Sequence, residues 1–503
     1  MASLIEKLTA EEGGESVKFL NDIVAQLWPH INVAGCKMVK DIVEPMFASM
    51  LPGPLSSLHF TKIDLGHVPF ELSNVLVTKT ETESIKLQVS RDIILFLEIS
   101  DMNLDWAGKC DVQLDGNMIP TLGVKGIALH GRLSILLGPT SDIIPLIGAA
   151  QIAFVNPPVL KLDFTGAANV ADSDMIDGAV RKVIINIINS IFTLPNRLLI
   201  KLDASNDYFK TQLFPIGIMR ITVEKATGFA EDKKGAARKL FSKITRASPD
   251  TYCNVSVGAE EAWRTTTKDN TTNPSWNETH DFVVTDLNQC ITLDLMDHDV
   301  NSDDEIGLAV TTVKEILAAG GKQELSMVHK DNPIEGKISV SCKFYHFAAE
   351  GSSLSASDHS SDGLMCGVAS VLVAGVFGIP GKREELNPSV VVSWGEKHRF
   401  QTAAKTDAPG TDISNPAFDQ AFRIPITADM LGSGAQNFRI ALMNKKDEIG
   451  AIDVPLSDVQ QAPDMILQNK FDVGGGATVR ASICLRGLVP ASMEETVLPQ
   501  RQK

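Results

Sequence analysis

A long apolar stretch between residues 127 and 202 constrains the fold most, because its apolar residues recur at every second position. A period of two is typical of strands with one apolar face. Two series carry it: Leu129, Leu133, Ile135 and Leu137, and then Leu160, Leu162 and Phe164. The apolar face either packs in an ordinary β-rich core or lines a cavity. Periodicity alone leaves both interpretations open.

Helices are expected on either side of these strands, because apolar residues there recur at three and four positions. One series spans residues 17–31, and a second spans 39–50 and ends at Leu51-Pro52-Gly53-Pro54. A third stripe runs from Ile176 to Ile191 and is ended by Pro195. The first region is therefore predicted to hold two opening helices, several strands and a closing helix.

Length and composition exclude some classes of function. A chain of 503 residues suggests about three domains. The net charge of -16 argues against nucleic acid and against unaided attraction to an anionic membrane, because both are negative. The seven cysteines are scattered without a CxxC pair, which fits a reducing cytosol better than a disulfide framework or a zinc site.

Membrane insertion has little support in the sequence. Residues 1–14 carry early charges and no apolar signal core. Residues 364–380 come closest to a spanning helix, but that window is short and contains Gly367, Gly375 and Gly378. We expect a buried strand and its turn at this place instead.

Four motifs of the first region resemble those of the synaptotagmin-like mitochondrial-lipid-binding-protein (SMP) domain, in the same order. The first is Leu20-Asn21 followed by Leu27-Trp28-Pro29, and the second is Leu65-Gly66-His67-Val68-Pro69. The third is Phe154-Val155-Asn156-Pro157-Pro158 followed by Leu162-Asp163-Phe164. The fourth, Leu194-Pro195-Asn196-Arg197, is similar to the closing motif in the extended synaptotagmins.

This resemblance covers residues 15–203 and implies a tubular lipid-binding (TULIP-like) half-barrel that holds glycerolipids, usually as a homodimer. One apolar strand face then lines a lipid groove, because each buried acyl methylene gains about 0.8 kcal/mol without directional contacts. Headgroups would stay near solvent, so little headgroup selectivity is expected. The groove candidates are Leu95, Leu97, Leu133, Ile135, Leu160, Leu162 and Phe164.

The second region, residues 214–347, contains the string Asn273-Pro274-Ser275-Trp276-Asn277-Glu278. The string is specific, and it makes this region resemble a C2 domain, which is an eight-stranded β-sandwich. Ser248-Pro249-Asp250-Thr251-Tyr252 is similar to a second motif of that family, with Pro and Asp displaced by one position.

An acidic loop at residues 297–307 carries most of the chemistry of this region. Crowded carboxylates repel one another unless a cation neutralises them, and hard oxygen ligands suit calcium. An EF-hand is excluded, because Ser302 stands where glycine is needed and Leu308 where a bidentate glutamate belongs. A solvated acidic turn is the open alternative. The resemblance to the third calcium loop of a C2 domain rests on Asp297, Asp299 and Asp304.

The first calcium loop of a C2 domain is only partly matched. The resemblance carries Asp250 over directly, whereas Lys233 occupies the place of its partner and Asp232 comes one residue early. The pattern therefore does not predict a full complement of bound ions. The candidate ligands for Ca2+ are Asp232, Asp250, Asp297, Asp299 and Asp304.

A basic insert lies between Asp232 and Asp250, with apolar residues on one helical face. A basic amphipathic helix beside a calcium loop suits an anionic membrane surface. A helix packed on the rim of the sandwich with solvated charges is an equal alternative. The candidates for membrane contact are Lys239, Leu240, Phe241, Lys243, Ile244 and Arg246.

The third region, residues 364–488, follows a Ser-rich linker at 348–362 and repeats the C2 pattern. The segment from Asn415 to Phe422 is a weakened form of the earlier string, and Asp447-Glu448-Ile449-Gly450 matches Asp304 to Gly307. Its loop is shortened to Asn444-Lys445-Lys446-Asp447. Because two lysines occupy this loop, calcium binding is not expected there.

Catalysis has little support, because no Gly-x-Ser-x-Gly, His-Glu-x-x-His or Walker loop is present. One SMP domain followed by two C2 domains resembles the extended synaptotagmin, plant synaptotagmin and tricalbin family. The resemblance implies a mostly β protein with some α that carries glycerophospholipids under calcium control. A calcium-dependent tether without transport is the alternative, and a calcium-dependent phospholipase is remote.

The expected location follows from the same resemblance. The family acts at contacts between the endoplasmic reticulum and the plasma membrane, through an N-terminal hydrophobic anchor. This chain begins almost at the predicted half-barrel, without such an anchor. We therefore expect either that the sequence is part of a longer one or that the protein is cytoplasmic and peripheral, recruited reversibly to membranes.

Overall fold

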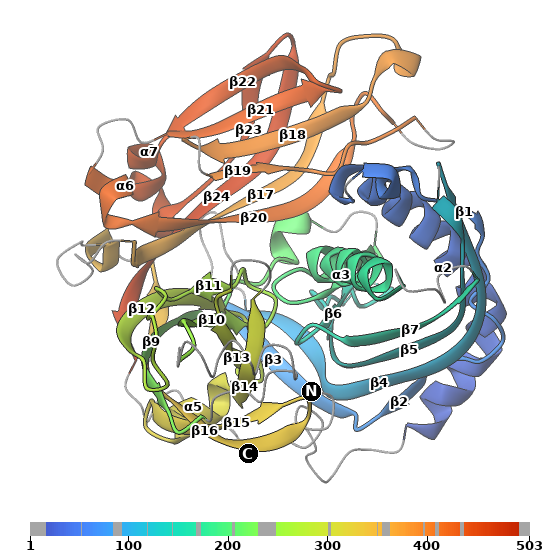
Figure 1. The fold of residues 1–503 in the computed structure, drawn as a ribbon. Coiled ribbons are helices and arrows are strands. Elements are labelled where there is room, and N and C mark those ends of the chain that lie inside the picture. Colours follow the sequence, from blue (N-terminus) through green and yellow to red (C-terminus); the bar gives the residue numbers. More distant parts are fainter. Residues whose placement is uncertain are drawn as a thin grey trace.

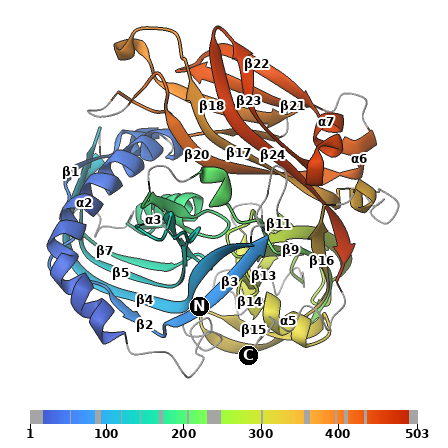
Figure 2. The same cartoon turned by 180° about the vertical axis from the view of Figure 1, so that it is seen from behind.

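The computed structural model describes residues 17–51, 53–83, 93–117, 119–142, 144–166, 173–203, 207–229, 248–299, 303–349, 351–354, 363–395, 398–407, 412–432 and 437–491. Figure 1 shows a curled sheet with two helices, followed by two β-sandwiches, and Figure 2 shows the same three units from behind. The prediction of a mostly β fold with a half-barrel and two sandwiches is confirmed.

The half-barrel is one curled antiparallel sheet of the order β1-β4-β5-β6-β8, with β2 and β3 paired to β4 and β7 paired to β5. Its pairing shifts register at three places between β4 and β5, and such irregularities increase twist and bend strands. The long β4 and β5 can therefore curl. The bounds are β1 His59–Lys62, β2 Glu71–Ser73, β3 Leu76–Glu83, β4 Ile93–Gly116, β5 Ile119–Leu137, β6 Ala149–Phe154, β7 Val159–Gly166 and β8 Leu198–Lys201.

Two helices complete this unit: α2 (Lys18–Met50) and α3 (Ser173–Phe192), and Figure 1 shows α3 within the curve of the sheet. The prediction of two opening helices is wrong, because α2 is one helix that contains Pro29 and continues through residues 32–38, which separate the two apolar series. Trp28 donates to Gly66 O at 2.9 Å, and Asn32 donates to Asp64 Oδ1 at 2.8 Å. These bonds hold both sides of the proline to one segment, which offsets the lost helical bond.

The segment that receives α2 requires a glycine. Gly66 has φ +76, and a Cβ there would lie 1.8 Å from the carbonyl oxygen of Lys109 on β4. Only a residue without a side chain permits this approach. Trp106 on β4 donates to Val68 O at 2.9 Å, so the motif at 65–69 ties the helix to the sheet.

The first sandwich encloses a continuous apolar core that includes Ile221, Val255, Leu293 and Ile338. Alternate residues of β10 and β13 are buried, as expected for strands with one face in a core. The bounds are β9 Gly217–Thr227, β10 Thr251–Val257, β11 Trp263–Arg264, β12 Ser275–Val284, β13 Cys290–Asp297, β14 Asp304–Thr312, α5 Val313–Ala318, β15 Lys322–His329 and β16 Asn332–Ala348.

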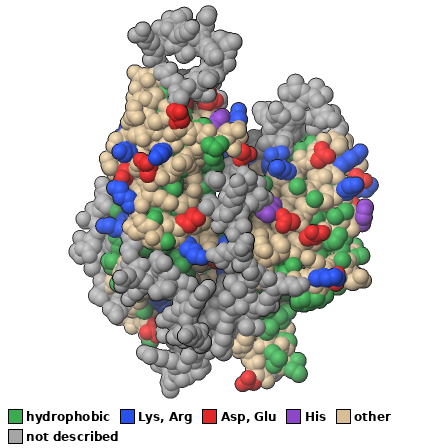
Figure 3. Space-filling view, turned by 90° about the horizontal axis from the view of Figure 1, so that it is seen from below, with side chains coloured by type: hydrophobic (Ala, Val, Ile, Leu, Met, Phe, Trp, Pro, Cys, Tyr) green, Lys and Arg blue, Asp and Glu red, His purple; other side chains and the backbone are tan. Residues whose placement is uncertain are grey.

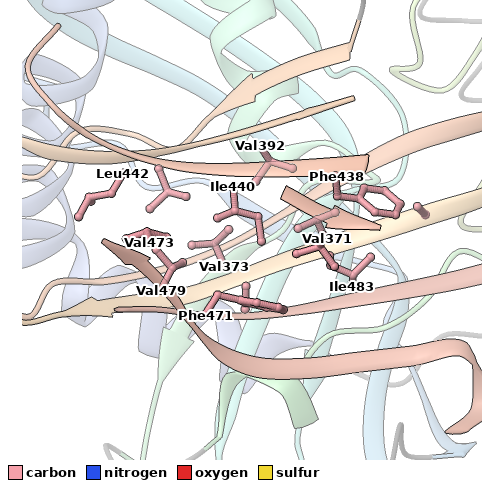
Figure 4. Packing of buried hydrophobic residues seen from close by; sticks show 14 of the residues in the cluster. Val371, Val373, Val392, Phe438, Ile440, Leu442, Phe471, Val473, Val479 and Ile483 are labelled. Carbon is pink, nitrogen blue, oxygen red and sulfur yellow. The ribbon is translucent and has the colours of Figure 1, made fainter. Parts of the chain in front are cut away.

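The second sandwich places β18, β19, β21 and β22 opposite β17, β20, β23 and β24, and Figure 4 shows Val371, Val392 and Ile440 among the side chains between the layers. Residues 364–380 thus form a buried strand, as predicted. The bounds are β17 Met365–Phe377, β18 Pro388–Trp394, β19 His398–Gln401, β20 Ala417–Thr427, α6 Ala428–Gly432, β21 Asn437–Asn444, β22 Asp447–Pro455, α7 Leu456–Gln461, β23 Ile466–Gly474 and β24 Ala477–Pro490. Among the described helices, none could cross a membrane.

The three units are joined by specific polar contacts. Asn156 of the half-barrel accepts from Cys290 N at 2.7 Å and donates to Asn288 O at 3.1 Å in the first sandwich. Strand β16 pairs with β24, so one sheet continues from the first sandwich into the second. Arg220 forms a buried bidentate pair with Asp281, and Asp281 also accepts from Met365 N at 2.8 Å.

Candidate functional site

An apolar cavity of about 230 Å³ lies inside the half-barrel, between α2, α3 and the sheet. All of its lining side chains are hydrophobic, and the indole N–H of Trp106 is already bonded to Val68 O. Empty cavities with apolar walls stay dry and accept apolar ligands. The site is therefore suited to hydrocarbon. Its walls include Met38, Val39, Phe47, Val124, Ile127, Leu129, Leu160, Leu162, Val180, Ile184, Ile187, Ile188 and Ile191.

The predicted groove residues divide between several places. Leu160 and Leu162 on β7 line the cavity, and Phe164 packs in the adjacent core with Val43 and Phe47. Leu133 and Ile135 do not line it, because they lie farther along β5. There they pack in a second cluster with Leu20 and Val24 of α2. Leu95 and Leu97 lie on β4 and pair with β3, but their side chains lie outside the described residues.

Helix α3 forms much of the cavity wall, although none of its residues was predicted to line the lipid groove. Val180, Ile184 and Ile187 recur at helical spacing and line the cavity opposite β7. This apolar stripe is visible in the sequence. The stripe can be assigned to the groove only once the position of α3 inside the curled sheet is known, and no local sequence pattern predicts that position.

The acidic residues of the first sandwich meet at one end of β10, β13 and β14. Asp297, the last residue of β13, pairs with Thr251 on β10 and with Asp304 on β14. The backbone N–H of Asp250 donates to Asp297 Oδ1 at 2.9 Å, and Asp250 Oδ1 accepts from Asn270 N at 2.7 Å. Asp250 is thus placed beside Asp297 and Asp304, from which it is distant in sequence, at the ends of adjacent strands.

Asp303, which we did not predict as a site residue, holds this loop to the sandwich. Its Oδ2 accepts from the Tyr252 hydroxyl at 2.6 Å, and its Oδ1 accepts from Asp299 N at 3.1 Å. Nδ1 of His298 lies 2.9 Å from the same Oδ1. The Tyr252 bond and then the His298 bond lower the pKa of Asp303 to about 2. Both oxygens of this carboxylate are already engaged by protein groups.

Three comparisons with known proteins agree with this geometry. The model of the synaptotagmin-like mitochondrial-lipid-binding domain matches residues 13–203, and the C2 domain model matches 217–327 and 369–470. A solved structure of Extended-Synaptotagmin 2, SMP–C2A–C2B domains, covers 95% of this chain and 100% of that chain at 22% identity, with a TM-score of 0.62. The order of all three units is the same. The chain has an SMP domain followed by two C2 domains, and in this order of units it is similar to the extended synaptotagmins.

The curated relatives are longer than the part of them that this chain matches. Human Extended synaptotagmin-2 is 26% identical over 495 residues, which are 94% of this chain and 50% of that protein. Mouse Extended synaptotagmin-1 is 30% identical over 312 residues, which are 61% of this chain and 27% of that protein. The chain thus spans about half the length or less of these curated relatives. It carries one lipid-binding SMP domain followed by two C2 domains.

The acidic end of the first C2 domain fits a hard cation in chemistry, because carboxylate oxygens are the ligands that calcium prefers. Within the described parts of the chain, however, no three acidic, cysteine or histidine side chains surround one point. Asp232 and the candidate membrane contacts at Lys239, Leu240, Phe241, Lys243, Ile244 and Arg246 lie outside the described residues.

Proposed function

We propose that this protein transfers glycerophospholipids between apposed membranes and docks to them under calcium control, without catalysing a reaction. The apolar cavity within the SMP domain is the observation that carries the proposal. Contacts between the endoplasmic reticulum and the plasma membrane are the proposed place of action. The family resemblance alone supports that location, because the curated relatives are about twice as long as the matched part.

The volume of the apolar cavity limits how much lipid it can hold without opening. Its volume of about 230 Å³ is below the roughly 300–1,000 Å³ of pockets that bury drug-sized ligands. A two-chain lipid therefore requires α3 to move away from the sheet. Burial of acyl methylenes, at about 0.8 kcal/mol each, supplies the free energy for that opening. This mechanism makes chain length matter more than headgroup chemistry.

Calcium would act on the acidic end of the first C2 domain. Asp250, Asp297, Asp299 and Asp304 are the proposed ligands, with Asp232 from the preceding loop. A bound ion would neutralise these carboxylates and offer positive charge to lipid phosphates. On the face drawn in Figure 3, acidic and basic side chains of the described residues are interspersed. Because the chain has a net charge of -16, attraction to an anionic membrane has to be supplied locally, by the ion or by the basic insert.

A homodimer is proposed to form through the SMP domain. Helix α2 leaves Phe19, Ile23 and Leu27 about half exposed or more, at 62%, 49% and 49% of their full area. These residues recur every four positions, so they share one face of the helix. An apolar stripe of this kind favours burial against another surface.

Transfer of a fluorescent glycerophospholipid between two liposome populations tests the proposal, with and without calcium. We expect transfer to rise with calcium for the unchanged protein. Asp304→Asn should weaken calcium binding by about tenfold or more, because one charged ligand is lost. The matched control is Asp447→Asn at the equivalent loop of the second C2 domain, which should leave calcium dependence unchanged. Equal effects of the two substitutions would contradict the calcium assignment.

A tether without transport is the second candidate, and the small volume of the cavity favours it. Such a protein would bring two liposome populations together in calcium without moving lipid between them. Clustering of liposomes without any transfer of the fluorescent lipid would therefore support the tether and overturn transport.

A further inference from the structure

A second cavity, of about 660 Å³, lies where the SMP domain and both C2 domains meet. The SMP side contributes Pro195 and the strand that follows it, and the first C2 domain contributes Glu260 and Val283. The second C2 domain contributes most of β20, including Arg423. Unlike the apolar cavity, this one has mixed walls and charged side chains from different units. It is separate from the acidic loop of the first C2 domain.

Positive charge exceeds negative charge in the walls of this junction cavity. Its charged lining consists of two carboxylates, Glu260 and Asp419, and four cations, Arg197, Lys201, Lys405 and Arg423. Lys201 Nζ pairs with Asp419 Oδ2 at 2.5 Å. The lining therefore has a net charge of about two positive units in a chain whose net charge is -16. A cleft whose net charge is positive attracts anions.

Arg423 is a cation of this cavity whose hydrogen bonds are incomplete. Its Nη2 donates to Pro195 O at 3.4 Å, whereas the buried Nη1 has no hydrogen-bond partner. Glu260 Oε1 lies 3.7 Å from Nη1, which is beyond hydrogen-bond length. Burial lowers the pKa of Arg423 to about 10, although Glu260 raises it. A buried donor left without an acceptor is costly, so an anion at this point would be stabilising.

We propose that the junction cavity binds a phosphate group, carried either by a lipid headgroup or by a soluble phosphate ester. A phosphate offers several strong acceptor oxygens, and the planar guanidinium of arginine matches them well. Lys405 lines the same cavity and adds a second positive charge to it, with its ammonium group 5.7 Å from the centre of the Phe418 ring. This site goes beyond lipid transfer, since phosphate would bind whether or not the SMP domain carries lipid.

The position of the cavity gives both sources of phosphate a physical route. Ile191 of α3 lines this cavity and the apolar cavity alike. A lipid whose chains lie in the SMP domain could therefore place its phosphate at the junction. A soluble ester would enter from solvent instead. In either case the ligand contacts more than one unit, so its binding stabilises their docked arrangement.

Isothermal titration calorimetry on the whole chain, in phosphate-free buffer at low salt, tests the site. The probes are inorganic phosphate, glycerol 3-phosphate and dihexanoylphosphatidic acid below its micelle concentration. We expect saturable binding that Arg423→Gln weakens by about tenfold or more, because a charge-assisted hydrogen bond is lost. Arg399 on β19 is exposed, so Arg399→Gln removes one positive charge outside the cavity and should leave binding unchanged. Tighter binding of the lipid probe than of glycerol 3-phosphate identifies a headgroup, and equal binding identifies a soluble ester.

A second variant keeps the test decisive if Arg423→Gln destabilises the junction. Lys405→Gln removes a half-buried charge in the loop after β19 and leaves in place the bond that the side-chain amide of Asn387 donates to Lys405 O. It should weaken binding of the same probes severalfold. The proposal is overturned if none of the three probes binds saturably, or if folded Lys405→Gln and folded Arg423→Gln both bind them as tightly as the unchanged protein.

Discussion

Replacing Ile184 by tryptophan is expected to remove bound lipid almost completely, with at least a tenfold loss of transfer. Ile184 lies on α3, is only half buried, and points into the cavity of about 230 Å³. An indole at this position fills much of the space that an acyl chain would take. Because the side chain already borders a void, the added volume should cost less stability than overpacking of a filled core. Lipid transfer between liposomes and the lipid content of the purified protein both measure the effect.

The matched control adds the same side chain outside the cavity. Val33 on α2 is 73% exposed, so Val33→Trp places an indole in solvent. This variant should carry and transfer lipid as the unchanged protein does. If Ile184→Trp were folded and still transferred lipid at the normal rate, the cavity would not be the lipid site.

The second large effect is expected at the contact between the two C2 domains. Asp281→Ala should lower the free energy of unfolding by about 3–5 kcal/mol, because it leaves a buried arginine charge without its partner. Arg220 Nε and Nη2 each donate to Asp281 at 2.8 Å, and the side chains are 10% and 1% exposed. Burial alone would lower the pKa of Arg220, but the bonds to Asp281 raise it, so the arginine stays charged.

Two further variants separate this pair from a general effect of charge removal. Glu324→Ala breaks an ion pair with Lys337 at 2.8 Å in which both side chains are 50% exposed, and should cost far less stability than Asp281→Ala, because solvent screens an exposed pair. The double variant Arg220→Met with Asp281→Leu should recover most of the stability, because no unpaired charge remains. Differential scanning calorimetry measures all three. Equal losses for Asp281→Ala and Glu324→Ala would contradict the account of a buried pair.

The sequence predicted the fold well wherever one face of an element is apolar. Strands at 129–137 and 160–164 alternate, and the string around Trp276 identified a sandwich whose core does contain that indole. Prediction failed for α2, because its two apolar series are separated at residues 32–38, whereas the bonds of Trp28 and Asn32 to residues 64–66 hold one continuous helix. Those bonds join residues far apart in sequence, and no local pattern contains them.

The candidate sites were predicted less completely than the fold, because they too depend on contacts between residues that are far apart in sequence. Alternation indicates that Leu133 has an apolar environment, but it does not say whether a helix or a void covers that face. In the structure the N-terminal part of α2 covers Leu133, whereas Leu160 faces the void. Asp303 was not predicted because its partner Tyr252 lies on another strand. Arg423 carries no motif at all, and its setting appears only where three units meet.

Mass spectrometry of the lipids that remain with the whole purified chain, after detergent has been washed away, tests the central claim most directly. The account predicts glycerophospholipid in near-stoichiometric amount for the unchanged protein and for Val33→Trp, and almost none for Ile184→Trp. A folded protein that carries no lipid, with calorimetric unfolding intact, would contradict the claim that this cavity holds lipid.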